Sequence, residues 1–292
     1  MQQPGRFVLV SVFVILTVIW GTTWAAIRIG LQGIPPFTGV AVRFGIAALV
    51  LLIAARLRGV RLGALPAERW LWVANALLAF CTSYGVVYWC EQWVPSGLAS
   101  VLFSTFPLFI AIMSHFALPQ ERLTLRGAAG VLLGFAGVAV IYSQDLTLLG
   151  GPQVAFAATV FLISPFVSAI AQVIIKRWGQ GVHPFSLTAV PMAITAVVMG
   201  GLALLTEREA SFTFDAVSIG ALLYLALAGS AVTFSLLYWL LARLSATRVS
   251  LVAYTIPVVA VCVGALFLGE TITPRIIAGS AMVLLGVFLA AH

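Results

Sequence analysis

The sequence predicts an all-α integral membrane protein with ten transmembrane helices, arranged as two five-helix repeats of inverted topology, and with both termini in the cytoplasm. Three observations predict this fold: the composition, the number of long apolar runs and an internal repeat. Of the 292 residues, 62% are hydrophobic and only 8% are charged, whereas a soluble domain carries about 25% charged residues. The composition therefore excludes a soluble domain, and it argues against a nucleic-acid-binding protein despite a pI near 9.9.

Ten apolar runs have about the 20 residues that a helix needs to cross a bilayer. Proline and glycine separate several of them, as in Ile34-Pro35-Pro36 and His183-Pro184. The connections are too short to form a separate soluble domain. The expected spans are residues 7–27, 36–55, 70–90, 96–118, 127–143, 154–175, 184–205, 216–240, 249–268 and 274–290.

The distribution of Lys and Arg predicts the orientation, because cytoplasmic loops are enriched in both. An N-terminus inside the cell leaves Arg28, Arg208 and Arg275 outside and Arg43 within the second span, and it places the other basic residues in the cytoplasm. With ten spans, the C-terminus lies on the same side. We therefore expect a multi-pass protein of the cell inner membrane with cytoplasmic termini.

An internal repeat divides the chain into residues 1–147 and residues 148–292. A shift of about 150 residues aligns Tyr88-Trp89 with Tyr238-Trp239, Ser100 with Ser250, Thr105 with Thr255 and Pro107 with Pro257. Because each half holds five helices, the second half enters the membrane from the opposite side. Inverted repeats of this kind are typical of secondary transporters, which bind substrate near the midplane between the repeats and work by alternating access.

Several motifs resemble the EamA family of the drug/metabolite transporter superfamily, over essentially the whole chain. They are Ile19-Trp20-Gly21-Thr22-Thr23-Trp24, Val42-Arg43-Phe44, Leu118-Pro119-Gln120-Glu121 and Leu268-Gly269-Glu270. Pro119-Gln120 interrupts the Leu-Gly-Glu motif that the family shows at this point. The aromatic helices are most similar to YddG-type exporters of aromatic and other neutral amino acids, and the resemblance implies a related substrate.

Polar side chains within the spans are candidates for the substrate path, because lipid leaves them unsatisfied. Ser164, Ser168 and Gln172 follow one another at intervals of four residues and share one helix face. Two further pairs precede prolines at matching places in the repeats. These are Ser100 and Ser104 before Pro107, and Ser250 and Tyr254 before Pro257. The alternative for each serine is helix packing, which small polar residues favour.

Buried aromatic residues supply a second set of candidates. A Tyr hydroxyl or a Trp N–H needs a hydrogen-bond partner that lipid does not provide. We therefore expect some of these side chains to face a cavity that suits a zwitterion with an apolar side chain, or an aromatic cation. The candidates are Trp20, Trp24, Tyr84, Tyr88, Tyr238 and Tyr254.

Pro107 and Pro257 interrupt the hydrogen bonding of their helices, so we expect them to act as helix breaks with a role in gating. Arg43 and Glu91 are candidates for a charge role. Arg43 attracts a substrate carboxylate in one interpretation and stabilises the fold in the other. Glu91, at the outer end of the third span, is the best candidate for a proton acceptor.

The function that we predict is a carrier that exports neutral amino acids, with aromatic ones favoured, through a central cavity between the repeats. Because no Asp or Glu falls at mid-depth in a span, we expect facilitated or weakly coupled transport. The alternative is an exporter of another small metabolite, an aromatic cation or a drug, with proton coupling. An enzyme would need carboxylate pairs, a His cluster or a metal site at membrane depth. We expect no cofactor, no metal site, no nucleic-acid partner, and a functional monomer in the lipid bilayer.

Overall fold

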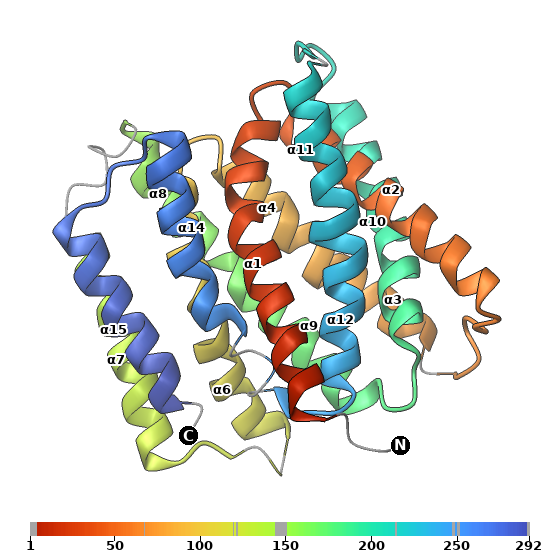
Figure 1. Ribbon diagram of the computed structural model, residues 1–292, viewed down its shortest axis with the longest axis horizontal. Helices are drawn as coiled ribbons and strands as arrows, with labels where there is room; N and C mark the ends of the chain where they lie inside the picture. Colours follow the sequence, from red (N-terminus) through yellow and green to blue (C-terminus); the bar gives the residue numbers. More distant parts are fainter. Residues whose placement is uncertain are drawn as a thin grey trace.

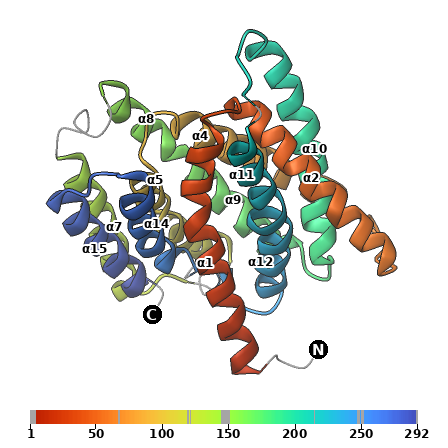
Figure 2. The ribbon, with the colours of Figure 1, turned by 45° about the horizontal axis from the view of Figure 1, so that its top comes forward.

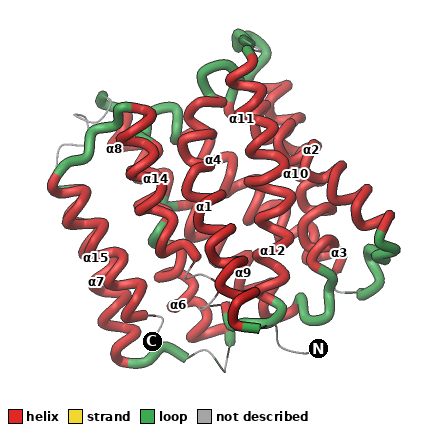
Figure 3. Tube along the Cα trace, in the orientation of Figure 1, coloured by secondary structure: helices red, strands yellow, loops and turns green. Residues whose placement is uncertain are grey.

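The computed structural model describes residues 5–66, 68–118, 120, 122–143, 151–213, 215–246, 249 and 252–290. Within these residues, the side chains of Arg6, Ala253, Tyr254, Thr255 and Ala290 are not described. The described residues form helices joined by short loops (Figure 3), and none of them forms a strand.

Eight helical segments are long and apolar enough to cross a membrane, and two shorter apolar helices, Ile256–Leu268 and Pro274–Leu289, complete the set within the described residues. Within the described residues, each of the ten predicted spans falls mainly on helix. The predicted first half contains α1 (Arg6–Gly30), α2 (Pro36–Leu57), α3 (Glu68–Asn75), η1 (Ala76–Thr82), α4 (Ser83–Cys90), α5 (Ser96–Phe103), α6 (Phe106–Ala117) and α7 (Leu125–Tyr142). The predicted second half contains α8 (Gln153–Phe161), α9 (Ile163–Trp178), α10 (Pro184–Thr206), α11 (Ala216–Ala226), η3 (Leu227–Val232), α12 (Thr233–Leu241), α14 (Val252–Leu268) and α15 (Pro274–Ala290).

In the part of the chain that the structure describes, two π-helical segments interrupt otherwise α-helical spans at matching places in the sequence. One is η1, between α3 and α4, and the other is η3, between α11 and α12. Each segment begins within an Ala-Leu pair that the 150-residue shift aligns: η1 begins at Ala76 of Ala76-Leu77, and η3 begins at Leu227 of Ala226-Leu227. Single π-helical turns are rare and occur frequently at functional sites.

Helices from the two predicted halves pack against one another in pairs. The pairs are α1 with α14, α2 with α10, and α7 with α15. The α7–α15 pair lies at one edge of the bundle, at the left of Figures 1 and 2. Glycines allow its helix backbones to touch. A Cβ atom on Gly286 would lie 2.5 Å from the carbonyl oxygen of Gly130, and one on Gly137 would lie 2.6 Å from that of Gly279.

The molecule has two ends along the helix axes (Figure 1). We call the end where α1 begins and α15 finishes the terminal face, and the end where α1 finishes and α2 begins the opposite face. At the opposite face, carboxylates from the second half bind helix N-termini of the first half. Glu207 accepts hydrogen bonds from the amides of Phe37 and Thr38, at 2.7 and 2.8 Å. Free amides and the helix dipole favour an anion there.

The second carboxylate at the opposite face belongs to Glu270. It accepts hydrogen bonds from the amides of Ser96 and Gly97, at 2.7 and 2.8 Å, at the start of α5. Glu207 and Glu270 therefore connect the two halves at this face. At the terminal face, Glu68 of the first half accepts a hydrogen bond from the hydroxyl of Ser186 in α10, at 2.5 Å.

Candidate functional site

A cavity of about 100 Å³ lies inside the bundle, and we call it the central cavity. Helices α1, α4, α9, α12 and α14 contribute to its wall, together with η1, α5 and α6. Among the described residues that line it there is no Asp, Glu, Lys, Arg or His. The complete lining comprises Trp20, Thr23, Trp24, Ile27, Ala79, Ser83, Tyr84, Val87, Phe103, Phe106, Ser168, Ala171, Gln172, Phe234, Leu237, Tyr238, Val249, Val252 and Ile256.

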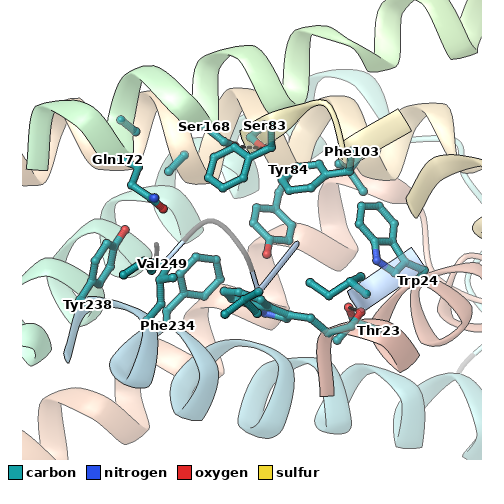
Figure 4. Close-up of a pocket in the computed structure, with 18 of the residues that line it drawn as sticks. Thr23, Trp24, Ser83, Tyr84, Phe103, Ser168, Gln172, Phe234, Tyr238 and Val249 are labelled. Atoms are coloured by element: carbon teal, nitrogen blue, oxygen red, sulfur yellow. Dashed lines mark hydrogen bonds between the residues drawn. The ribbon is translucent and has the colours of Figure 1, made fainter. Parts of the chain in front are cut away.

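The structure brings six of the residues singled out from the sequence to the wall of this cavity. They come from both predicted halves, and most carry an aromatic ring. Figure 4 shows Trp24 with Phe103 at one end of the cavity, Tyr238 with Gln172 at the other, and Tyr84 between them. The six residues are Trp20, Trp24, Tyr84, Ser168, Gln172 and Tyr238.

The indole N–H groups of Trp20 and Trp24 are buried and have no hydrogen-bond partner. Both rings line the cavity, and each packs on another ring. Trp20 contacts Phe234 edge-on at 5.5 Å between ring centroids, and Trp24 contacts Phe103 at the same distance. Buried donors are almost always satisfied, so an unpaired one requires an explanation. A ligand with acceptor oxygens would satisfy both donors.

Three serine hydroxyls form a hydrogen-bonded row beside the cavity. Ser83 of α4 lies 2.8 Å from both Ser164 and Ser168 of α9, measured between hydroxyl oxygens, and the Ser168 hydroxyl donates. Ser83 and Ser168 line the cavity, whereas Ser164 is fully buried behind them. The row joins the two predicted halves with polar atoms at the cavity wall.

Tyr238 separates the central cavity from a larger hollow of about 920 Å³ at the terminal face, because its side chain lines both. Its hydroxyl donates to the side-chain oxygen of Asn75 at 3.0 Å, and the Asn75 amide nitrogen lies 2.8 Å from the same hydroxyl. That nitrogen also donates to the carbonyl of Leu187, at 2.8 Å. The pair therefore holds Tyr238 between the two spaces.

Ser100 and Ser104 do not line the central cavity. Both are buried, and each hydroxyl donates to a carbonyl of its own helix. Ser100 donates to Gly97 at 2.7 Å and Ser104 donates to Ser100 at 3.0 Å. Hydroxyls satisfied in this way have no free donor for a ligand.

The two prolines that were expected to break helices, Pro107 and Pro257, occupy different positions within their helices. The chain leaves α5 at Phe103 and starts α6 at Phe106, so that Pro107 lies in the first turn of a new helix. Pro257 lies inside α14, which continues through it. Ser250 and the side chain of Tyr254 lie outside the described residues.

Arg43 is buried in the bundle, and it lies behind the cavity wall. Its Nε donates to the Ser230 hydroxyl at 2.8 Å, and one Nη donates to the carbonyl of Gly229 at 3.1 Å, both in η3. The other Nη lies 3.3 Å from the hydroxyl of Tyr88, and the guanidinium lies 4.7 Å from the centre of the Tyr84 ring. Tyr88 is therefore a partner of Arg43 and does not line the cavity.

Glu91 also lies away from the cavity. It follows α4 at the opposite face and is fully buried, and neither carboxyl oxygen has a hydrogen-bond partner. Arg28 of α1 donates to the backbone carbonyl of Glu91. Burial raises the pKa of Glu91 well above the usual range of a glutamate, and the positive charge of Arg28 opposes that rise only in part.

Sequence reasoning did not single out three residues that shape this site. Phe103 and Phe234 form ring contacts around the cavity, and Asn75 holds Tyr238. Phenylalanines carry no polar signal within an apolar span, so only the structure could identify these two. Asn75 carried a detectable signal, because it is an uncharged polar side chain inside the third predicted span.

Comparison with known proteins identifies a family and several relatives. The model of the EamA-like transporter family matches residues 8–143 and again residues 155–291. YoaV of Bacillus subtilis, an uncharacterized transporter, is 26% identical over 94% of this chain and 93% of its own. The uncharacterized inner membrane transporter YedA of Escherichia coli K12 is 32% identical over 88% of this chain and 82% of its own.

A probable terminal-alkyne amino-acid exporter of Streptantibioticus cattleyicolor is 30% identical over 94% of this chain and 91% of its own. A solved crystal structure resembles this chain with a TM-score of 0.74 and 20% sequence identity. The match covers 98% of this chain and 97% of the chain in the crystal structure. The likeness to the solved structure concerns the fold alone.

Proposed function

The chain belongs to the EamA-like transporter family, and on that premise we propose that it carries neutral amino acids out of the cell through the central cavity. Family membership makes the protein a transporter of the inner membrane with several membrane-crossing helices. Relatives named as transporters point to transport rather than catalysis. The exporter of Streptantibioticus cattleyicolor, named for amino acids, supports this substrate class.

The observation that carries the proposal is the pair of unpaired indole N–H groups in a cavity without charged residues. Trp20 and Trp24 offer two donors to the carboxylate of an amino acid. An ammonium group is attracted to the faces of aromatic rings and to hydroxyl oxygens, and Tyr84, Ser83 and Ser168 provide both. A zwitterion therefore finds partners for both of its charges, and an apolar side chain finds Phe103 and Phe234.

The central cavity, as it is here, is too small for an aromatic amino acid. An apolar cavity of about 150 Å³ binds benzene in another protein, and this cavity measures about 100 Å³. An aromatic amino acid therefore enters only if side chains such as Tyr84, Phe103 or Phe234 move outward. We infer that the cavity is contracted here and widens during transport.

Alternating access between two inverted five-helix repeats, residues 1–147 and 148–292, is the mechanism that we propose. Three features support it: the two family matches, the paired π-helical segments, and the position of Tyr238 between the central cavity and the hollow at the terminal face. The cytoplasmic position of the terminal face follows from the distribution of basic residues. Transport is facilitated, because the described cavity lining holds no group that binds a proton near neutral pH.

The aromatic lining also favours a second candidate function, the export of an aromatic cation, since cations bind to ring faces. A cation would leave both indole donors unpaired, and the lining offers it no carboxylate. We therefore prefer the zwitterion.

Counterflow of radiolabelled phenylalanine in proteoliposomes tests the proposal, with unlabelled neutral amino acids and aromatic cations as competitors. Trp24→Phe retains a ring and removes the donor. A hydrogen bond to a charged group contributes about 1.5–3 kcal/mol, so we expect the KM to rise roughly ten- to a hundred-fold. Trp89→Phe is the matched control, because Trp89 contacts Trp93 and does not line the cavity.

An unchanged KM for Trp24→Phe would show that the indole N–H of Trp24 does not bind the substrate. Competition by cations alone, with no exchange of any neutral amino acid, would contradict the substrate class.

A further inference from the structure

Glu91 carries a buried carboxyl group that does not line the central cavity. It lies directly after the segment Glu68–Cys90, at the opposite face, and its exposed fraction is 0%. Neither carboxyl oxygen has a hydrogen-bond partner. An ionised carboxylate without partners is very costly to bury, and such a group takes a proton instead. In this arrangement of the helices Glu91 is therefore neutral.

The charged groups that face Glu91 come from three elements, and each positive one already has acceptors. Arg28 of α1 donates to the backbone carbonyl of Glu91 itself. Arg43 of α2 donates to the side chain of Ser230 and to the carbonyl of Gly229. Glu270, before α15, adds a negative charge that disfavours a second one nearby.

The elements next to Glu91 in the chain add no further charge. On α4, the titratable neighbours are Tyr88 and Cys90. A tyrosine hydroxyl and a cysteine thiol are both uncharged at neutral pH. Helix α8, which packs with α4, and helix α5, which packs with α8, contain no charged residue. Nothing described around Glu91 replaces the water that an ionised carboxylate requires.

We propose that Glu91 is a proton-binding site whose occupancy closes the opposite face. With the proton bound, the carboxyl group stays buried at the end of α4, with Arg28 on the backbone carbonyl of Glu91 and the charge of Glu270 nearby, as it does here. Loss of the proton favours an arrangement in which water reaches Glu91. In such an arrangement we expect the contact of Glu270 with the start of α5, which joins the two predicted halves at this face, to open as well.

The sign of the pH effect follows from the burial. The closed face holds the pKa of Glu91 above its usual range, and the hydrated, open face returns it toward about 4.3. Closure is therefore favoured at low pH and is lost as the pH rises through the pKa of the closed state.

Glu91 lines neither the central cavity nor the hollow at the terminal face. It exchanges its proton with the solution at the opposite face alone. A proton taken up and released on the same side of the membrane does no transport work. Glu91 thus sets how readily that face opens, and transport remains facilitated. This consequence for transport rests on the proposed carrier function, whereas proton binding and closure do not.

The experiment measures closure and protonation without substrate. The protein, with Cys81, Cys90 and Cys262 replaced by Ala, carries spin labels at Gln32 and Thr271 and is reconstituted in lipid nanodiscs. These exposed residues lie in loops of the opposite face, one in each half. Pulsed electron paramagnetic resonance gives their distance between pH 5 and pH 9. Infrared spectroscopy follows the C=O stretch of buried protonated carboxyl groups in parallel samples.

For the wild type, we expect the distance to lengthen and the carboxyl band to disappear over the same pH range, with a midpoint well above the usual pKa of glutamate. Glu91→Gln imitates the protonated form, so its distance stays short throughout and the band is absent. Glu209→Gln is the matched control and behaves as the wild type, because Glu209 is an exposed loop residue.

Several results would overturn the proposal. One is a wild type whose distance does not depend on pH, which decides the matter even if Glu91→Gln fails to fold. Another is a Glu91→Gln variant that keeps the pH response. A third is closure that follows the concentration of Na⁺ at constant pH, which would make Glu91 a cation site. If the pH response of the distance depends on Glu91 but no amino acid is exchanged in counterflow, the proton-binding site is supported and the proposed substrate is contradicted.

Discussion

The α7–α15 pair and the wall of the central cavity are built in contrasting ways, although both join the two predicted halves. In α7–α15, glycines bring backbone against backbone, and no space remains for even one additional carbon atom at Gly286. Around the cavity, large rings meet at centroid distances near 5.5 Å and leave about 100 Å³ empty, with unpaired donors at Trp20 and Trp24. The first region has the properties of a fixed support, and the second those of a place where contacts change.

Glycine to leucine changes give the largest expected effect, and they test the fixed region. Gly286→Leu places a side chain where a Cβ alone would lie 2.5 Å from a carbonyl oxygen and from an amide nitrogen of α7. Since backbone atoms cannot yield as a side-chain end does, we expect loss of folded protein, measured as the monodisperse fraction in size-exclusion chromatography.

Gly201→Leu is the matched control, because Gly201 also lies within a helix and a Cβ there meets nothing within 4 Å. It should yield normal amounts of protein. A Gly286→Leu variant that folds as well as Gly201→Leu would contradict the close contact of α7 and α15.

A double-mutant cycle on Asn75 and Tyr238 gives an intermediate effect, at the end of the cavity next to the hollow. Asn75→Leu leaves the carbonyl of Leu187 without its donor and Tyr238 without its partner. We expect a loss of about 1–3 kcal/mol in the free energy of unfolding, measured by denaturation in detergent. Tyr238→Phe should cost less when Asn75 is already leucine, since the hydrogen bond is then absent. Strictly additive losses would show that the pair does not interact.

The smallest effect is expected between α7 and α15, where nothing should move. Spin labels at Leu132 and Leu285, which are 73% and 50% exposed, report the distance between these helices without entering their contact. This distance should stay constant when substrate is added or the pH changes, while the Gln32–Thr271 distance responds to pH. A shift of both distances together would make α7–α15 a moving part and would remove the contrast.

The helices and much of the site could be predicted because apolar length and polar spacing are local properties of the sequence. The second predicted span, 36–55, differs from the observed α2, Pro36–Leu57, by two residues at its end. Ser168 and Gln172, chosen for their shared helix face, both line the cavity. Glycine spacing is another local property: Gly130, Gly134 and Gly137 recur along α7, and this helix is in close contact with α15.

The remaining placements depend on tertiary contacts that spacing does not encode. Ser100 follows the same polar pattern as Ser168, but its hydroxyl bonds to Gly97 of its own helix. A sequence cannot show whether a serine turns toward its own backbone or toward a neighbour. Glu91 stands next to a predicted loop and would be expected in water, whereas it is completely buried. Its shielding comes from helices that are distant in the sequence.

The two π-helical segments have a consequence for how the cavity wall is oriented. A π-helical turn holds one residue more than the α-helix around it, and each residue of an α-helix corresponds to about 100° of rotation. Ring orientation beyond η1 and η3 therefore depends on that extra residue, for Tyr84 in one span and for Tyr238 in the other. If either segment reverted to a plain α-helix, its tyrosine would swing by about a quarter turn. Rotation about a helix axis, without any tilting of whole helices, is thus a second way to reshape the space that the substrate occupies.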